Sequence, residues 1–241
     1  MDQDARARNP LFGPNKFKLG IFSANCDGGL TMSRAPERWK ADWDDIAAMS
    51  QIADDAGIEF ILPVAKWRGY QGDANIYGRS LETLTHGAAL AAITKRIAIF
   101  STVHVPMVHP LFAAKALATV DQASNGRAGL NIVAGWNPDE FAMFGLERVE
   151  APYDQASEWI EIISRLYAQT EPFDHEGTYY TMRNAVTLPK PVAGKRPPVL
   201  NAAFSPPGRA FAAQNADFLF TTFKSIAAGK TTIEDMAARS S

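Results

Sequence analysis

Residues 96–134, RIAIFSTVHVPMVHPLFAAKALATVDQASNGRAGLNIVA, contain the pattern that decides the fold. Arg96–Val103 is a short run rich in apolar residues that predicts a strand, and Leu111–Gln122 has the length and pattern of a helix. The turn Ser124-Asn125-Gly126 ends this helix, and Ala128–Ala134 predicts the next strand. Because a helix-length segment separates the two strands, we expect them to pair in parallel within an α/β fold.

The same alternation extends in both directions along the chain. Strands are predicted at 17–23, 59–64, 198–203 and 216–223, and helices at 43–56, 81–93, 153–169 and 207–214. Six strand–helix units fit either a doubly wound sheet or a (β/α)8 barrel. The loop after the first strand, Ser23–Leu30, lacks the G-x-G-x-x-G fingerprint of a doubly wound nucleotide binder, so a barrel is favoured.

Two segments interrupt the alternation. Residues 173–186 contain alternating aromatic and polar residues after a glycine turn, and predict a hairpin inserted between the fourth and fifth strands. Residues 188–198 are rich in proline and predict an extended connector. We therefore expect an N-terminal extension at 1–16, a partial barrel of about six of eight β/α units at 17–223, and a polar tail at 224–241.

The composition is that of a soluble globular protein. Of 241 residues, 46% are hydrophobic and 21% are charged, with a net charge of −2. This balance argues against a nucleic-acid or anionic-membrane partner. A lone cysteine, Cys26, excludes a disulfide framework within the chain, and with four histidines it gives little material for a metal site. We find neither a signal peptide nor a transmembrane run, and expect a cytoplasmic protein.

Candidate functional residues are the polar side chains just past the predicted strand ends, where a parallel barrel places its active face. They include Lys66, His104, His109, Asn131 and Ser205. Each has a structural alternative: a solvated loop cation, a hydrogen-bonded histidine, or the N-cap of a helix. Asn131 lies within an apolar strand, where leaving its amide unpaired costs roughly 1–3 kcal/mol, so a ligand or a partner side chain is required.

The stretch at 121–137, DQASNGRAGLNIVAGWN, resembles a signature of the bacterial-luciferase-like flavin monooxygenases. In that family a helix ending D-x-x-S-x-G-R leads into a strand ending N-x-V-[TSA]-G-W. The resemblance continues in order through Glu140-Phe141, Tyr153, the hairpin at 173–186, Lys190-Pro191 and Ala216-Asp217. The branch of the family that the chain is most similar to holds pyrimidine, dimethyl-sulfone and alkanesulfonate monooxygenases.

The resemblance implies a (β/α)8 TIM barrel of the luciferase-like type, incomplete in this chain. It also implies use of FMN as FMNH2, supplied by a separate NAD(P)H-dependent flavin reductase, with O2, to oxidise a small organic substrate through a flavin peroxide. A homodimer or homotetramer is usual in the family. The FMN contacts that it implies are Ala65, Lys66, Asn131, Glu140, Pro152, Tyr153 and, near the phosphate, Ser205.

The catalytic roles follow in part from the resemblance and in part from position. Lys66 and Asn131 would hold the flavin or its peroxide, whereas His104 is our candidate proton donor or substrate contact from its place after a strand. Trp67, Trp136 and Phe204 are candidate walls of an apolar pocket. Two alternatives remain open: a relative that uses the deazaflavin F420 for hydride transfer, and a non-catalytic flavin-binding protein or inactive fragment.

Overall fold

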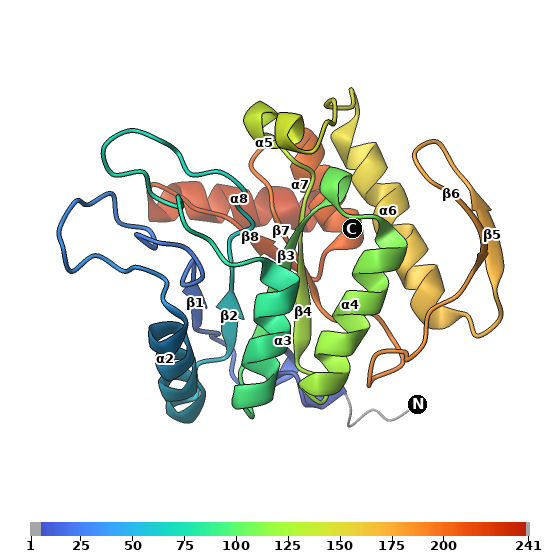
Figure 1. Ribbon diagram of the computed structural model, residues 1–241. Helices are drawn as coiled ribbons and strands as arrows, with labels where there is room; N and C mark the ends of the chain where they lie inside the picture. Colours follow the sequence, from blue (N-terminus) through green and yellow to red (C-terminus); the bar gives the residue numbers. More distant parts are fainter. Residues whose placement is uncertain (1–5, 240–241) are drawn as a thin grey trace.

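The computed structural model describes residues 6–239 and contains one six-stranded parallel sheet in the order β1-β2-β3-β4-β7-β8. The strands are β1 (Gly20–Phe22), β2 (Phe60–Leu62), β3 (Ala98–His104), β4 (Ala128–Val133), β7 (Val199–Ala202) and β8 (Phe218–Phe220). The sheet is curled, with helices along its convex side (Figure 1). This is the incomplete (β/α)8 barrel that the resemblance implies.

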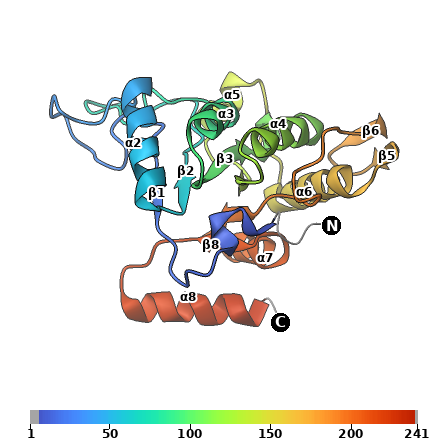
Figure 2. The same cartoon turned by 90° about the horizontal axis from the view of Figure 1, so that it is seen from below.

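Helices follow the strands and cover the sheet. They are α2 (Trp43–Ala56), α3 (Thr83–Ile93), α4 (Pro110–Ala123), α5 (Pro138–Met143), α6 (Pro152–Ala168), α7 (Pro206–Asn215) and α8 (Ile226–Arg239), with short 3-10 turns η1 (Pro10–Phe12) and η2 (Val105–Met107). Viewed from below, α8 runs along one side of the molecule beyond α7 (Figure 2). Its contact with α7 includes an ion pair of 3.1 Å between Arg209 and Asp235.

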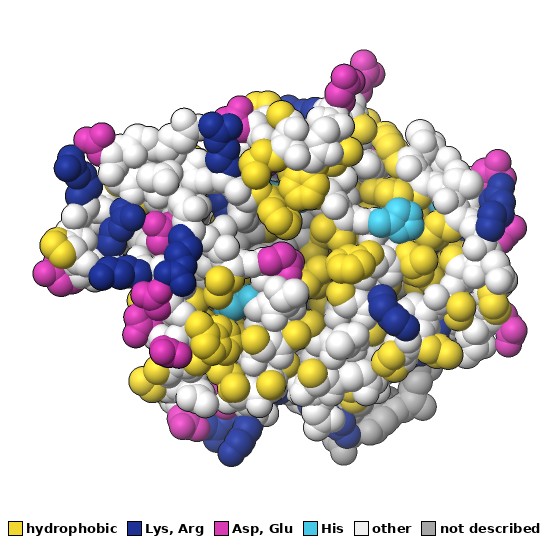
Figure 3. All heavy atoms as spheres, in the orientation of Figure 1, with side chains coloured by type: hydrophobic (Ala, Val, Ile, Leu, Met, Phe, Trp, Pro, Cys, Tyr) yellow, Lys and Arg dark blue, Asp and Glu magenta, His cyan; other side chains and the backbone are white. Residues whose placement is uncertain are grey.

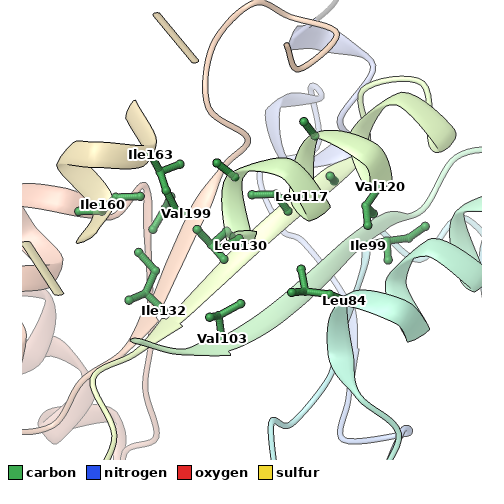
Figure 4. Packing of buried hydrophobic residues seen from close by; sticks show 14 of the residues in the cluster. Leu84, Ile99, Val103, Leu117, Val120, Leu130, Ile132, Ile160, Ile163 and Val199 are labelled. Atoms are coloured by element: carbon green, nitrogen blue, oxygen red, sulfur yellow. The ribbon is translucent and has the colours of Figure 1, made fainter. Parts of the chain in front are cut away.

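The larger hydrophobic core fills the space between the sheet and the helices on its convex side. Alternate residues of the strands point into it because successive side chains of a strand face opposite ways. Figure 4 shows this core, in which side chains from β3, β4 and β7 pack against α3, α4 and α6. The labelled members are Leu84, Ile99, Val103, Leu117, Val120, Leu130, Ile132, Ile160, Ile163 and Val199.

A smaller core fills the concave side, which is the interior of the partial barrel. It contains Leu11, Leu62, Ala98, Phe100 and Leu200, with Phe22, Phe60, Phe218 and Phe220 packed against them. The rings of Phe22 and Phe220, from the first and last strands, have centroids 5.0 Å apart. Gly129 makes room for Phe100, because a Cβ atom at Gly129 would lie 2.7 Å from that ring.

The motif at 121–127 makes hydrogen bonds that join neighbouring segments at the amino-terminal end of the barrel strands. The Asp121 carboxylate accepts hydrogen bonds from Val192 N, at 2.7 Å, and Ala128 N, at 3.3 Å. The buried Arg127 guanidinium donates to the carbonyl oxygens of Thr94 and Ile97, at 2.9 and 2.6 Å, where α3 ends and β3 begins. This part of the family signature therefore stabilises the fold at the end opposite the carboxyl ends of the strands.

The predicted hairpin is formed by β5 (Phe173–Glu176) and β6 (Thr181–Ala185), between the fourth and fifth barrel strands. Glu158 on α6 holds it in place. Its carboxylate lies 3.0 Å from His175 Nε2 and accepts hydrogen bonds from Tyr179 N and Tyr180 N at 3.0 and 2.9 Å. The hairpin accordingly lies beside α6 at the edge of the molecule (Figure 1).

The segments near both ends of the chain pack against the barrel or form regular structure. Within the N-terminal segment, Leu11 in η1 packs into the interior core beneath the sheet. Within the polar tail expected at 224–241, residues 226–239 form helix α8, with Gly229 buried against Phe223. No helix within residues 6–239 is long and apolar enough to cross a membrane.

Candidate functional site

The predicted site residues gather at the carboxyl ends of the barrel strands. Lys66 comes from the loop after β2, His104 ends β3, and Asn131 lies within β4. Glu140 is the third residue of α5, the short helix that follows β4. The right-handed β/α succession brings the segments that carry these four residues, which are up to 74 positions apart in the chain, to one end of the sheet.

Lys66 and Glu140 form a buried ion pair. Lys66 Nζ lies 2.9 Å from Glu140 Oε1, and the two side chains are only 4% and 2% exposed. The same oxygen accepts hydrogen bonds from Trp67 N and Arg68 N, at 3.0 and 3.2 Å. One carboxylate on α5 thus fixes both the cation and the backbone of the loop after β2.

The environment of Glu140 keeps its carboxylate ionised. Burial alone would raise the pKa of Glu140, but the hydrogen bond from Lys66, the two backbone N–H groups and the Lys66 charge outweigh it. The pKa of Glu140 is therefore held below its usual range.

Aromatic side chains cover this ion pair from the solvent side. The Lys66 ammonium lies 4.6 Å from the ring centroid of Tyr70 and 5.1 Å from that of Trp136. These two rings are nearly parallel, with centroids 6.5 Å apart. A second aromatic contact lies between Trp67 and Phe144, whose ring centroids are 4.9 Å apart. Aromatic pairs therefore link the loop after β2 to the segment after β4.

Asn131 is oriented by a hydrogen-bond chain that the sequence did not reveal. Its Nδ2 donates to Thr102 Oγ1 at 3.1 Å, and the Thr102 hydroxyl donates to the carbonyl oxygen of Pro63. Thr102 and Asn131 are register partners on β3 and β4. Because Nδ2 is engaged, Oδ1 of this buried asparagine is left as an acceptor without a partner among the described residues.

His104 lies on the other side of Glu140 from the loop. Its Nδ1 is 3.9 Å from Glu140 Oε2, too far for a hydrogen bond, and has no partner among the residues described. Burial lowers the pKa of His104, assisted by the charge of Lys66 and opposed by that of Glu140. The imidazole is therefore neutral at neutral pH.

A cavity of about 310 Å³ adjoins these groups. Lys66, Thr102 and His104 line it together with the loop after β2 and the start of α3, whereas Asn131 and Glu140 are not among its lining residues. Its remaining lining is mostly apolar or composed of small polar residues: Ala65, Trp67, Gly78, Ser80, Leu81, Thr83, Leu84, Val103 and Val108, with Arg79 and Glu82 at the side of α3. A small molecule fits a space of this size and character.

A second group of predicted residues meets at the start of α7. Ser205 is the N-cap of this helix, and its Oγ accepts a hydrogen bond from Gly208 N at 3.3 Å. Tyr153, in the first turn of α6, approaches so closely that a Cβ atom on Gly208 would lie 2.5 Å from its hydroxyl oxygen. Pro152 precedes Tyr153 as the first residue of α6. Hydroxyl groups at a helix N-terminus suit a phosphate group.

Other candidates have structural roles or lie at the rim. His109 is the N-cap of α4, where Nδ1 accepts a hydrogen bond from Leu111 N at 3.2 Å. Burial raises the pKa of the Cys26 thiol to about 12, which makes it unreactive near neutral pH. Phe204 is exposed beside Ser205. Within residues 6–239, no group of three or more His, Cys, Asp or Glu side chains is placed to hold a metal ion.

The surface around the site differs from the helical face. Figure 3 shows basic side chains over the two long loops that follow β1 and β2, whereas hydrophobic side chains cover much of the face formed by α4 and its neighbours. Two of the loop cations are paired: Arg38 lies 3.0 Å from Asp27, and Arg34 lies 3.0 Å from Asp73.

Comparison with known proteins supplies the context for this arrangement. The sequence model of the family described as luciferase-like monooxygenase matches residues 17–241. A pyrimidine monooxygenase, RutA, from Acinetobacter baylyi is 31% identical over 87% of this chain and 57% of its own length. RutA from Pseudomonas syringae pv. syringae is 32% identical over 86% of this chain and 58% of its own. The chain thus spans less than two thirds of the length of these relatives.

Solved structures share the fold. A riboflavin lyase, RcaE, crystallised with modified FMN and riboflavin, superposes with a TM-score of 0.82 at 22% identity, covering 93% of this chain and 58% of that one. The long-chain alkane monooxygenase LadA superposes with a TM-score of 0.82 at 20% identity, covering 95% of this chain and 61% of that one. At these identities the likeness concerns the fold, and the chain corresponds to the larger part of the barrel.

Proposed function

The chain belongs to the luciferase-like monooxygenase family, and on that basis we propose that it is the oxygenase component of a two-component flavin monooxygenase. It would take FMN as FMNH2 from a separate NAD(P)H-dependent flavin reductase and use O2 to oxidise a small organic substrate. When bound, reduced FMN supplies the electrons for activation of O2. The name of the RutA relatives suggests a small ring compound as the substrate.

The observation that carries this proposal is the free acceptor of Asn131. Its Oδ1 is buried and unpartnered, while its Nδ2 is committed to Thr102. A flavin ring offers N–H groups, one at N3 in both redox states and another at N5 when it is reduced. A buried acceptor at the carboxyl end of β4 therefore fits a flavin ring better than it fits an anionic ligand.

The group of residues at α7 fits the other end of the cofactor. Tyr153 and Ser205 offer hydroxyl groups beside the N-terminus of a helix, where the helix dipole favours a negative charge. Pro206 and Pro207 have no backbone N–H, and the N–H of Gly208 is donated to Ser205 Oγ, so the hydroxyl groups of Ser205 and Tyr153 are the donors available in this turn. We propose that these groups hold the phosphate.

The residues between these two ends would position the ring and exclude water. The Lys66–Glu140 pair fixes the loop after β2 against α5, and Tyr70 and Trp136 cover the ammonium group. These side chains would keep water away from the ring. His104, neutral and next to the cavity, is our candidate for proton transfer to or from the substrate at its imidazole nitrogen.

The proposal is tested by a coupled assay of the purified chain with a flavin reductase, NADH, FMN and O2. With uracil as the first substrate tried, we expect a product containing an oxygen atom from 18O2, formed only when both proteins are present. Binding of FMN without any oxygenated product from a panel of ring compounds, sulfones and sulfonates would instead favour a non-catalytic flavin-binding protein. Hydride transfer to F420 without consumption of O2 would favour the deazaflavin alternative.

The assembly and the limits of the domain are further parts of the proposal. We propose a homodimer or homotetramer, and a partial luciferase-like barrel domain at 17–223, preceded by an extension at 1–16 and followed by a tail at 224–241. Analytical ultracentrifugation of the purified chain measures its oligomeric state directly.

A further inference from the structure

The position of Glu140 beside His104 determines which imidazole nitrogen carries the hydrogen and which one is the acceptor. Nδ1 of His104 lies 3.9 Å from Glu140 Oε2 and has no hydrogen-bond partner among residues 6–239. Glu140 is ionised, so that a lone pair on Nδ1 would face a negative charge, whereas an Nδ1–H group would be attracted to it. Nδ1 is accordingly the protonated nitrogen.

A neutral imidazole with hydrogen on Nδ1 has an acceptor at Nε2. His104 lines the cavity and makes no other hydrogen bond within the described part of the chain, so Nε2 is the group that it offers to a ligand. We propose that Glu140 is a positioning residue that holds His104 as its Nδ1–H tautomer, and that Nε2 accepts a hydrogen bond from an N–H or O–H group of an uncharged ligand in this cavity.

The charges around the cavity support an uncharged ligand. Lys66 is neutralised by Glu140 at 2.9 Å. Arg79 is paired with Asp42, and the Glu82 carboxylate accepts hydrogen bonds from Leu84 N and Thr85 N at the start of α3. An anionic ligand would therefore have to displace a carboxylate from an existing pair, and a cation would meet no free carboxylate.

The hydroxyl hydrogens of Ser80 and Thr83 in the lining are committed, so these groups, like Nε2 of His104, can only accept a hydrogen bond from a ligand. Ser80 Oγ donates to the carbonyl oxygen of Lys66 at 2.6 Å, and Thr83 Oγ1 donates to that of Thr102 at 2.5 Å. If the chain is the monooxygenase proposed above, its substrate is thus a neutral molecule with a hydrogen-bond donor. This requirement disfavours sulfonates, carboxylates and plain alkanes or sulfones as substrates of this cavity.

The tautomer is measured by long-range 1H–15N correlation spectra of the chain labelled with 15N-histidine at pH 8. The signals of His104 are assigned by their loss in His104→Gln. We expect Nδ1 to be pyrrole-like and Nε2 to be pyridine-like, the reverse of the form that free histidine favours. In Glu140→Gln we expect the populations to move toward the Nε2–H form.

The matched control is Glu158→Gln, which removes the charge beside a different histidine. Glu158 contacts His175 Nε2 at 3.0 Å at the hairpin, away from the cavity. This variant should alter the signals of His175 and leave those of His104 unchanged. An Nε2–H tautomer of His104 in the unaltered chain would overturn the proposal, and that spectrum alone decides it even if Glu140→Gln does not fold.

Ligand selection is measured by calorimetry with three matched probes. Uracil is neutral and has N–H donors, 1,3-dimethyluracil has none, and orotate adds a carboxylate. We expect each of the latter two to bind at least tenfold more weakly than uracil, with the preference for uracil over its dimethyl analogue lost in His104→Phe. Equal binding of the three probes, or no binding of uracil to a chain that binds FMN, would overturn the ligand assignment. A chain that binds no FMN would instead overturn the proposed function.

Discussion

The ammonium group of Lys66 lies 2.9 Å from the carboxylate of Glu140, and neither side chain is more than 4% exposed. A buried pair of this kind adds little stability compared with an apolar replacement, yet removing one partner leaves an unpaired charge in the interior. The pair joins the loop after β2 to α5, so its integrity determines the shape of the candidate site.

We expect Lys66→Met to lower the free energy of unfolding by about 3–5 kcal/mol, because it leaves the Glu140 carboxylate buried without its cation. Urea denaturation at neutral pH measures this change. The control is Arg68→Met, since Arg68 and its partner Asp139, 3.5 Å away, are 47% and 56% exposed. That variant should lose less than about 1 kcal/mol. Similar losses for the two variants would contradict the structural role assigned to Lys66.

Acid sensitivity is predicted from the buried His86 on α3. Neither ring nitrogen has a hydrogen-bond partner among the described residues, and burial lowers its pKa to about 4. In the unfolded chain the pKa of histidine is about 6.5, so the unfolded state binds a proton first as the pH falls. The stability should therefore decrease between about pH 6.5 and pH 4, by about 2 kcal/mol at pH 5 from this group.

His86→Leu should remove this contribution. Urea denaturation at pH 7 and pH 5 should show a smaller loss of stability on acidification for the variant than for the unaltered chain. A loss of the same size in both would show that His86 is already protonated or is solvated in the folded state.

Asp54 gives a second acid-dependent contribution, with a different origin. Its carboxylate accepts hydrogen bonds from the N–H groups of Lys95, Arg96 and Ile97, at 2.8, 2.7 and 2.6 Å, and so joins the end of α2 to the start of β3. Burial alone would raise the pKa of Asp54, but these N–H groups and the charge of Arg127 hold it below its usual range.

We expect Asp54→Asn to lower the stability by about 1–3 kcal/mol at pH 7, because the carboxamide replaces one acceptor oxygen with a donor. The stabilisation by Asp54 is present above the pKa of an unfolded aspartate, about 3.9, and is lost as the pH falls through the lower folded value. The difference between the variant and the unaltered chain should thus narrow below about pH 4. A constant difference down to pH 2 would contradict this assignment.

The interior of the partial barrel depends on a glycine facing an aromatic ring. A Cβ atom at Gly129 would lie 2.7 Å from Phe100, so Gly129→Ala should cost about 1–3 kcal/mol through overpacking. The double variant Gly129→Ala with Phe100→Leu should lose less than the sum of the two single variants. Additive losses in urea denaturation would show that the two positions do not share the same space.

The sequence is sufficient to predict the regular part of this fold. The helix predicted at 43–56 has the same bounds in the structure, because its apolar residues recur at helical spacing and Gly57, in the left-handed conformation, ends it. The strands are shorter than predicted: β1 covers 20–22 within a predicted 17–23. Apolar residues continue beyond the strand ends there, and periodicity does not distinguish paired from unpaired residues.

Short and polar elements were missed for physical reasons. Helix α5 has six residues, too few to show a helical period, although Asn137 followed by Pro138 is a recognisable N-terminal signal. Helix α8 contains few large apolar residues and was expected as a tail. The ion pair between Arg209 and Asp235 joins it to α7.

The sequence suggests candidate site residues one by one, but not the contacts between them. Lys66 and Glu140 were each expected from the family resemblance, yet their pairing joins positions 74 apart in sequence. Thr102 was not identified, because a threonine within a β-branched strand has no distinguishing signal. Its role follows from the register that places it opposite Asn131.

The most direct test of the account is a titration of the purified chain with FMN, followed by the change in flavin fluorescence. We predict saturable binding that Asn131→Ala weakens at least tenfold, because the variant removes the buried acceptor. Asn215→Ala, at the far end of α7, should leave the affinity unchanged. Binding of equal strength in Asn131→Ala, or no binding by a folded chain, would contradict the assignment of a flavin site to the carboxyl ends of these strands.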